Sequence, residues 1–464
     1  MAEWEAVIGL EVHAQLKTRT KMFCRCPLEY GAAENSRTCP VCLAHPGALP
    51  VPNARAIEMT ILLGLALDCE IAERAVFARK NYFYPDLPKG YQISQYEAPL
   101  CGRGRFLLPT AEGEREIGIV RAHLEEDAAK TVHAGGATGR SVGAAYSLVD
   151  FNRGGTPLVE IVTGPDLRSA EEATWFLRLL RQTIVELGIS DAEMEKGTLR
   201  ADVNVSLRRA GEEALRPRWE IKNLNSFGFV GRAIEAAVRQ QAAAHEAGEE
   251  VLQSTYDYDP DTDRLTVHRS KEEADDYRYF PEPDLVPLEP PAELVERLRG
   301  ELPERPGERI RRLAARLGFA SAAELVTTGN AWKAEALASA GLDWKAAAAI
   351  AMNRGDFRPE NAEALVRIVQ ANVTREALDE AFAAAAEGPL EADEYLGRTA
   401  LGDEAALAPV VESVLAAHPE QVETYRAGKE GVLGFLVGRV MRETQGKADP
   451  RVVNRLLRER LRAG

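Results

Sequence analysis

The chain has 464 residues, which is more than one ordinary hydrophobic core accommodates, so we expect two or three domains. Hydrophobic residues make up 45% of it, as in an ordinary globular protein, but the apolar runs are too short or too interrupted to cross a membrane. The formal net charge of -15 argues against a uniformly basic nucleic-acid-binding surface and leaves room for a local one. The first residues show no pattern of a signal peptide, so we expect a cytoplasmic protein.

The first predicted strand, residues 8–16, carries two polar side chains on one face. Glu11 and His13 are two residues apart, and side chains alternate along a strand, so both point the same way. A carboxylate beside an imidazole suggests a site for a hard metal ion. His13 could equally orient a partner or shuttle a proton.

Four cysteines follow this strand in two close pairs, Cys24 with Cys26 and Cys39 with Cys42. Such spacing can place four thiolates around one tetrahedral zinc ion, which would then be structural. Reduced thiols without a metal and a disulfide are the alternatives. Nothing in the sequence indicates the oxidising compartment that a disulfide requires.

Residues 78–97 are dense in aromatic side chains and hydrogen-bond donors, with Pro85 and Pro88 enforcing turns. They predict an ordered loop that lines a pocket, where Lys80 could contact a phosphate and Tyr82 could stack. Packing of the aromatic loop on its own domain is the alternative.

Acidic side chains recur on the later predicted strands. Residues 118–125 alternate so that Glu125 shares a side with His123, residues 199–207 place Asp202 on their polar side, and Glu220 follows in another strand-like segment. Carboxylates in a sheet are costly unless they are solvated, paired or bound to a metal. A concave sheet presenting several of them would bind Mg²⁺ and leave water positions for the phosphates of a nucleotide. A solvated sheet face with salt bridges is the alternative.

Two long helices are predicted between these strands. One begins at Ser169, with Glu172 completing a capping box, and ends at Gly188; the other covers about residues 225–248. Gly154 and its neighbour precede a strand, which is the wrong order for a P-loop, and no GxxxxGK[ST] occurs. Any ATP site is therefore not one of the common folds.

Prolines between residues 287 and 306 mark a domain boundary, beyond which the sequence reads as helices. We predict an α+β protein with a mixed sheet-and-helix cradle at 1–292, a helical domain at 293–400 and a helical tail at 401–464. The tail is net positive from residue 439 on, and Arg455, Arg458 and Arg462 are among the basic residues with which it could contact a nucleic acid. A solvated helix face is the alternative.

Seven long segments occur in this order along the chain: IGLEVHAQL, ARKNYFYPDLPKGYQISQ, HLEEDAAK, SLVDFNRGGTPLVEIV, MEKGTLRADVNVSL, EIKNLNSF and DYRYFPEPDL. Together they resemble the B-subunit family of tRNA-dependent amidotransferases, GatB. The terminal run FLVGRVMRETQGKADPRVVNRLL resembles the tail domain that this family shares with small YqeY-like proteins.

The resemblance implies that the chain uses ATP and Mg²⁺ to phosphorylate the side-chain carboxylate of Glu or Asp mischarged on tRNA(Gln) or tRNA(Asn). Ammonia from the amidase, the A subunit, then forms the amide, and a small C subunit joins the two. The family's helical and tail domains hold the tRNA, and the cognate synthetase is a further candidate partner. A zinc-stabilised tRNA-binding scaffold without its own catalytic site is the alternative function.

The resemblance also assigns roles to residues. The implied Mg²⁺ ligands are Glu11, His13, Glu125, Glu126 and Glu220. The implied catalytic residues are Lys80, Glu126 and Asp202, and we expect Tyr82, Asn204 and Ser206 to contact the nucleotide. Alternation points Glu125 and Glu126 to opposite faces, and because a bulge could bring in either one, the choice between them stays open. Zinc-binding cysteines occur in only part of the family.

Overall fold

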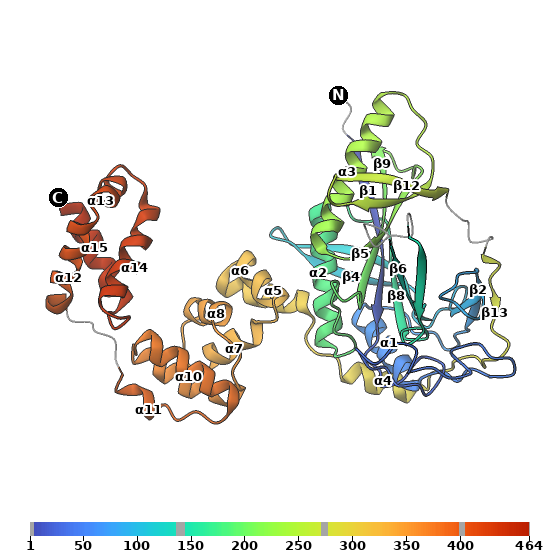
Figure 1. The fold of residues 1–464 in the computed structure, drawn as a ribbon, viewed down its shortest axis with the longest axis horizontal. Helices are drawn as coiled ribbons and strands as arrows, with labels where there is room; N and C mark the ends of the chain where they lie inside the picture. The colour runs from blue at the N-terminus through green and yellow to red at the C-terminus, as the bar shows by residue number, and fades with distance from the viewer. Residues whose placement is uncertain (1–3, 136–143, 271–276, 399–403, 464) are drawn as a thin grey trace. The chain divides into compact units, whose positions relative to one another are not determined.

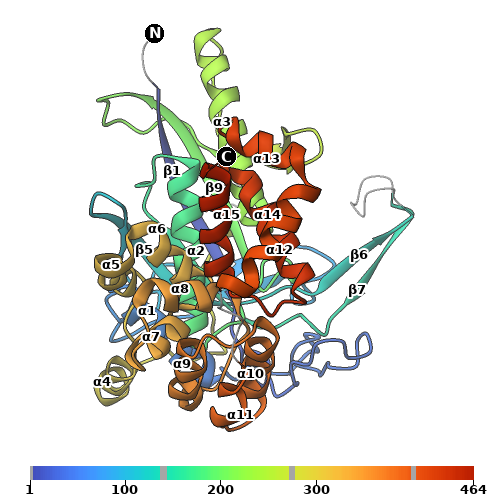
Figure 2. The same ribbon diagram turned by 90° about the vertical axis from the view of Figure 1, so that its left-hand side faces the viewer.

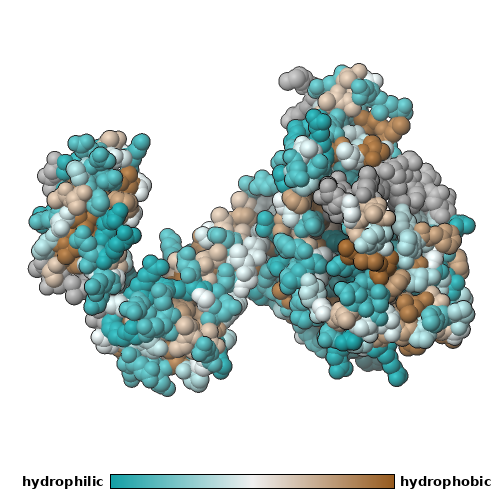
Figure 3. All heavy atoms as spheres, in the orientation of Figure 1, coloured by the Kyte–Doolittle hydropathy of each residue, from teal (hydrophilic) through white to brown (hydrophobic). Residues whose placement is uncertain are grey.

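A computed structural model of the chain describes residues 4–135, 144–270, 277–398 and 404–463 (Figure 1). The chain divides into two compact units, Met1–Arg311 and Arg312–Gly464. On the side seen in Figure 3, hydrophilic residues predominate on both units and apolar residues form small separate groups. None of the helices in the described part of the chain has the length and apolar character of a membrane span.

The first unit is built on an eight-stranded sheet in the order β12-β11-β10-β9-β1-β8-β5-β4. β1 lies inside it between β9 and β8, and all neighbouring strands are antiparallel except β10 and β11. The strands are β1 Trp4–Gln15, β4 Gly104–Pro109, β5 Glu114–Glu126, β8 Pro157–Thr163, β9 Leu199–Arg209, β10 Trp219–Leu224, β11 Ser254–Asp259 and β12 Arg264–Ser270.

Alternation gives this sheet an apolar face and a polar face. Ile8, Val203 and Val205 belong to the apolar face and are fully buried, each contributing about 1.5–3 kcal/mol through burial. Helix α3 (Phe227–Glu246) packs on β9 and β10, α1 (Ala54–Ala66) packs on β5, and α2 (Ala170–Glu186) lies beside α3 (Figure 1). The predicted alternation of residues 199–207 is confirmed, and the opposite face is left for polar side chains.

The register aligns the polar side chains in rows across neighbouring strands. Glu11 on β1 lies opposite Asp202 on β9, and His13 lies opposite Glu160 on β8. Glu160 in turn lies opposite His123 on β5. Side chains from β1, β5, β8 and β9 therefore meet on one face of the sheet.

Two smaller sheets flank the large one. β2 (Ala78–Asn81) pairs with β3 (Tyr91–Ser94) and with β13 (Phe280–Pro281), and β6 (Lys130–Ala134) forms a hairpin with β7 (Tyr146–Asp150), which projects from the unit in Figure 2. The expectation that residues 78–97 form a loop is corrected, because its two ends are paired strands. Burial of Ile93 explains why β3 is ordered as a strand.

The two long helices predicted between the strands are confirmed. The Ser169 hydroxyl accepts a hydrogen bond from the Glu172 backbone N–H at 3.0 Å, and Ser226 caps α3 in the same way. The Glu172 carboxylate does not complete the predicted box, because it accepts from the backbone N–H of Arg168 instead. Gly188, with φ of 66°, ends the first helix in the left-handed region.

The second unit is helical throughout its described residues. Two separate buried clusters hold it together, one within residues 337–392 and one within residues 407–461. Its helices are α6 Phe319–Thr327, α7 Ala331–Ser339, α8 Trp344–Asn353, α9 Ala362–Gln370, α10 Arg375–Glu387, α11 Asp393–Leu396, α12 Glu404–Ala417, α13 Pro419–Arg426, α14 Leu433–Glu443 and α15 Pro450–Ala463, while α5 Pro306–Leu317 spans the division.

The first unit extends beyond residue 292, where the sequence predicted the cradle to end. Helix α4 (Ala292–Gly300) packs on α1, with Leu298 buried, and Arg305 forms an ion pair with Asp68. The predicted boundary at 400/401 falls outside the described residues. The division into three domains stays a prediction.

Candidate active site

The polar face of the large sheet carries two clusters of metal-ligating side chains. In the first, one ligand atom from each of His13, Glu125 and Glu160 lies within 4.8 Å of the other two. In the second, Glu11, Asp202 and Glu220 meet the same limit. We call them the histidine cluster and the carboxylate cluster.

The histidine cluster brings two imidazoles against two buried carboxylates. Glu160 Oε2 lies 3.3 Å from His13 Nε2 and 3.5 Å from His123 Nε2, and His123 Nε2 lies 3.4 Å from Glu125 Oε1. The side-chain amide of Gln92 donates to Glu125 Oε2 at 2.5 Å. Glu125 Oε1 is buried and accepts no hydrogen bond from the described residues. This oxygen is therefore well suited to a cation.

The charges of this cluster shift its protonation equilibria strongly. Burial would lower the pKa of His13, but Glu160 outweighs it and raises that pKa to about 9. Burial and the neighbouring Glu160 carboxylate raise the pKa of Glu125. Burial opposes ionisation of Glu160 as well, but His123 and His13 hold its pKa well below the usual range. Positive charge on the two histidines thus stabilises the ionised carboxylate of Glu160.

In the carboxylate cluster, the ammonium group of Lys222 places a positive charge beside the carboxylates. Lys222 Nζ donates to Glu220 Oε1 at 2.7 Å and to Asp202 Oδ2 at 3.2 Å. Burial raises the pKa of Glu11, and the negative charges of Glu160, Glu220 and Asp202 raise it further. Lys222 thus bridges two of the three carboxylates of this cluster.

Asn204 borders the carboxylate cluster. Its amide nitrogen donates to Glu11 Oε1 at 3.0 Å, while its carbonyl oxygen is buried and accepts no hydrogen bond from the described residues. Buried carboxylate and amide oxygens, with one imidazole nearby, are the donor set that hard divalent cations take. The residues of both clusters therefore fit Mg²⁺.

Lys80 on β2 lies beside the histidine cluster within a group of tyrosines. Its Nζ lies 4.8 Å from the centre of the Tyr277 ring and 6.0 Å from that of Tyr82. Burial would lower the pKa of Lys80, but negative charge at Tyr279, Glu125 and Glu160 raises it overall. The ammonium forms no ion pair with a carboxylate of the described residues, so its charge is available to an anionic ligand.

The structure separates Glu125 from Glu126. Glu125 belongs to the histidine cluster, whereas the Glu126 carboxylate pairs with Lys89 and accepts a hydrogen bond from the backbone N–H of Ile93 at 3.1 Å. Glu126 lies outside both clusters, because consecutive residues of a regular strand point to opposite faces, and its role as a metal ligand stays a prediction. Ser206 lies on β9 opposite Val7 and outside both clusters.

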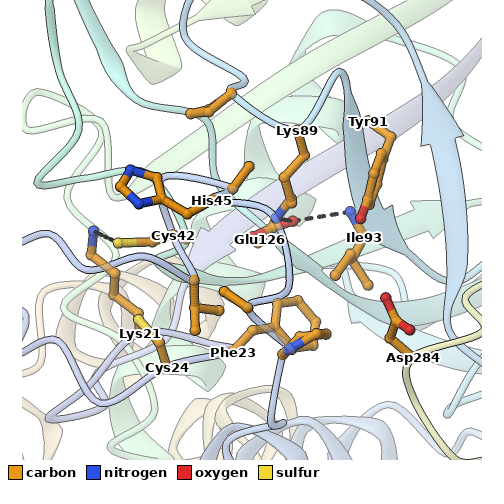
Figure 4. Close-up of a pocket in the computed structure, with 16 residues that line it drawn as sticks. Lys21, Phe23, Cys24, Cys42, His45, Lys89, Tyr91, Ile93, Glu126 and Asp284 are labelled. Carbon is orange, nitrogen blue, oxygen red and sulfur yellow. Dashed lines mark hydrogen bonds and ion pairs between the residues drawn. The ribbon is translucent and has the colours of Figure 1, made fainter.

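Glu126 lines a separate pocket of about 210 Å³, shown in Figure 4. Lys89 and Tyr91 border this pocket on one side, and Lys21, Cys24 and Cys42 border it on the opposite side (Figure 4). The pocket thus lies between the strand that carries Glu126 and the cysteine cluster.

Sequence reasoning missed Glu160 and the contacts of His123. Glu160 is the one acidic residue in the otherwise apolar strand Pro157–Thr163, so the rule that a carboxylate in a sheet needs a partner applied to it as well. The alternation that groups His123 with Glu125 was visible in the sequence. No local pattern indicated that Glu160 is the second carboxylate partner of His123.

The four clustered cysteines come together as their spacing predicts. All four sulfur atoms, those of Cys24, Cys26, Cys39 and Cys42, lie within 4.8 Å of one another. The sulfur atoms of Cys39 and Cys42 are 3.9 Å apart. Four Zn–S bonds of about 2.3 Å in a tetrahedron hold the sulfurs about 3.8 Å apart. The cluster therefore fits zinc, while zinc binding itself stays a prediction.

The electrostatics of this cluster single out Cys42 as the most acidic thiol. A hydrogen bond from Cys24 lowers the pKa of Cys42 to about 4, and burial raises the pKa of Cys26 to about 11. The backbone N–H of Cys39 donates to the Cys42 sulfur at 3.2 Å. The surrounding protein groups thus favour the ionised form of the Cys42 thiol.

The three predicted nucleic-acid contacts lie on α15. Arg455, Arg458 and Arg462 are exposed, and their spacing of three and four residues places them on one side of the helix. Arg455 pairs with Glu404, and Arg458 donates to the Asn454 side chain. The opposite side of α15 buries Val453 and Leu457.

Comparison with known proteins gives two matching families. A sequence model of the GatB/GatE catalytic domain matches residues 6–296, and a GatB domain model, GatB_Yqey, matches residues 344–461. The B subunit of the aspartyl/glutamyl-tRNA(Asn/Gln) amidotransferase of Anaeromyxobacter dehalogenans is 47% identical, with 99% of each chain covered. Proteins of the same name from Moorella thermoacetica and Persephonella marina are 44% and 43% identical, with 99% of this chain and 100% of each relative covered.

Proposed function

Because the chain belongs to the GatB family over almost its whole length, we propose that it is the B subunit of an aminoacyl-tRNA amidotransferase. Its reaction is the ATP-dependent conversion of Glu or Asp mischarged on tRNA(Gln) or tRNA(Asn) into Gln or Asn. The single observation that carries the proposal is the polar face of the large sheet, which holds the histidine cluster and the carboxylate cluster, with Lys80 of the neighbouring strand β2 close to the histidine cluster.

The chemistry explains why such a face is needed. A carboxylate resists attack by ammonia until one of its oxygens becomes a good leaving group. Transfer of the γ-phosphoryl group from ATP to that oxygen releases ADP and gives an acyl phosphate. Ammonia then attacks the carbonyl carbon, and inorganic phosphate leaves with the former carboxylate oxygen.

The proposed roles follow from the donor sets. His13, Glu125 and Glu160 would hold one Mg²⁺, and Glu11, Asp202 and Glu220 would hold a second. The metal ions supply charge neutralisation for the phosphate oxygens of ATP. Each buried carboxylate is an oxygen donor whose own charge is unfavourable without a cation, which supports these assignments.

Lys80 would bind a phosphate or substrate carboxylate oxygen, because its ammonium is held among tyrosine rings beside two carboxylates. Tyr82 and Asn204 border the same region and would contact the nucleotide. Ser206 would also contact the nucleotide from its position on β9 outside both clusters, and Glu126 would act from the neighbouring pocket.

The cysteine cluster would hold a structural zinc ion that braces the segment following β1. A zinc-stabilised scaffold without a catalytic site is the second candidate function, and the four gathered sulfurs are the observation in its favour. We further propose that the partners are the amidase (the A subunit), the small C subunit, mischarged tRNA and the cognate synthetase, in the cytoplasm.

The assembled complex of the three subunits tests the function. With ATP, Mg²⁺, glutamine and Glu-tRNA(Gln) or Asp-tRNA(Asn), we expect the corresponding amide on the tRNA, measured after the amino acid has been hydrolysed from it. Omission of either ATP or Mg²⁺ should stop amide formation, because the carboxylate is then not activated. Amide formation that continues without ATP would refute the proposal.

The tail gives a second prediction about tRNA binding. Replacing Arg455, Arg458 and Arg462 together with alanine should reduce the slope of log affinity for tRNA against log salt by about 1 for each phosphate that the variant can no longer bind. The control replaces three exposed arginines of the first unit, Arg74, Arg105 and Arg239, which changes the net charge equally. If the tail variant keeps the wild-type slope, α15 does not contact the tRNA backbone.

A further inference from the structure

Lys21, in the segment between β1 and the first cysteine pair, is fully buried with an exposed fraction of 0%. Its ammonium donates to the backbone carbonyl of Phe151 at 2.8 Å and to the sulfur of Cys42 at 3.6 Å. It forms no ion pair with a carboxylate among the residues that the structure describes. Among the described residues, the only group within hydrogen-bond distance of Lys21 that can carry negative charge is therefore the Cys42 thiol.

A buried ammonium is costly unless a negative charge compensates it. A zinc ion bound by four thiolates carries a net charge of two minus, since four negative sulfurs exceed the charge of Zn²⁺ by two. A lysine against one of these sulfurs reduces that excess to one. The negative charge of the cluster thus lowers the cost of burying the ammonium of Lys21.

We propose that Lys21 is the charge-balancing and positioning group of the cysteine metal site. This inference rests on the zinc site of the proposed function. Lys21 takes no part in phosphoryl transfer; it lowers the excess negative charge on the sulfurs and fixes the position of Cys42. Groups of this kind, which contact a metal ligand rather than the metal, commonly set metal affinity.

Lys21 also joins the cysteine cluster to the segment that precedes β8. Its carbonyl contact is with Phe151, in the segment that leads into β8, and the next residue, Met22, donates its backbone N–H to the Gly155 carbonyl at 2.7 Å. Gly155 has φ of 86°, and a Cβ there would lie 3.4 Å from the Lys21 side chain. The cysteine cluster and the segment before β8 thus contact the same lysine.

The affinity of the reduced full-length chain for zinc tests this inference, with a chromophoric chelator as competitor. Lys21→Met keeps the length of the side chain and removes its charge, and we expect zinc affinity to fall about 10- to 100-fold. Lys17→Met is the matched control, because Lys17 is exposed, pairs with Asp191 and should leave the affinity unchanged. Equal affinities of Lys21→Met and wild type would overturn the inference.

Lys21 could instead stabilise the fold only through its hydrogen bond to the Phe151 carbonyl. Thermal unfolding of the chain with and without zinc distinguishes this structural role from charge balancing. Loss of that hydrogen bond would cost the same stability in both forms. Charge balancing predicts that Lys21→Met lowers the melting temperature more in the zinc-loaded chain than in the zinc-free chain, and equal decreases would contradict it. Absence of zinc binding by the wild-type chain would instead refute the assignment of zinc to the cysteine cluster. Amide formation by the three-subunit complex is a separate measurement, so failure of the zinc site is distinguished from failure of the proposed reaction.

If Lys21→Met does not fold, the wild-type chain still gives an answer through acylation of lysine amines and mass spectrometry. Lys21 should be protected in the zinc-loaded chain and labelled after chelation, under conditions where the secondary structure is retained. Equal labelling of Lys21 in the two forms would overturn the inference.

Discussion

Glu160→Gln is expected to reduce amide formation on mischarged tRNA by about 10²- to 10³-fold, which is the usual cost of losing one electrostatic contact to a reacting centre. Glutamine keeps the size of the side chain and removes its charge. Glu160 lies within 3.5 Å of both His13 and His123 and belongs to the histidine cluster, so its charge is the one that organises that cluster.

The measurement is a single-turnover assay of the complex at saturating ATP and Mg²⁺. Glu116→Gln serves as control, because Glu116 lies on β5 in the same sheet but is exposed and faces Arg105. A Glu160→Gln complex that assembles normally and reacts as fast as this control would remove Glu160 from the active site.

Lys80→Met should have an effect of similar size, about 10²-fold or more, for a different reason. The ammonium of Lys80 is surrounded by tyrosine rings and has no carboxylate partner among the described residues, so methionine preserves most of the packing and removes only the charge that an anionic ligand would meet. Binding of tRNA, which depends on many contacts, should change little.

Lys196→Met is the control for this variant, because Lys196 is exposed and forms an ion pair with Glu193, three residues away in the sequence. The rate of phosphate release that depends on mischarged tRNA reports the activation step directly. Wild-type phosphate release by Lys80→Met would show that Lys80 does not contact the reacting groups.

Local patterns in the sequence predict much of this site. The two-residue period places Glu11 with His13, and Asp202 with Asn204, on common faces, because alternation is a property of a single strand. The spacing of the four cysteines likewise predicts their cluster, since a metal site closed by two short segments needs few distant contacts.

The remaining features depend on which strands become neighbours. Glu160 joins His13 and His123 only because β8 lies between β1 and β5, an order that no local pattern specifies. Glu125 comes close to His13 and Glu160 for the same reason, and the choice between Glu125 and Glu126 as metal ligand stays a prediction. Prolines near residue 290 indicate a break in the chain, but they do not show that α4 packs back on α1.

Trapping the activated intermediate tests the central claim most directly. The complex is given ATP, Mg²⁺ and Glu-tRNA(Gln) without glutamine, and hydroxylamine is added to capture any acyl phosphate as a side-chain hydroxamate. We expect one hydroxamate for each ADP formed by the wild-type complex and little or none with Glu160→Gln. Hydroxamate formed equally by both complexes, or absent from the wild type while amide formation proceeds, would contradict activation of the carboxylate on this sheet face.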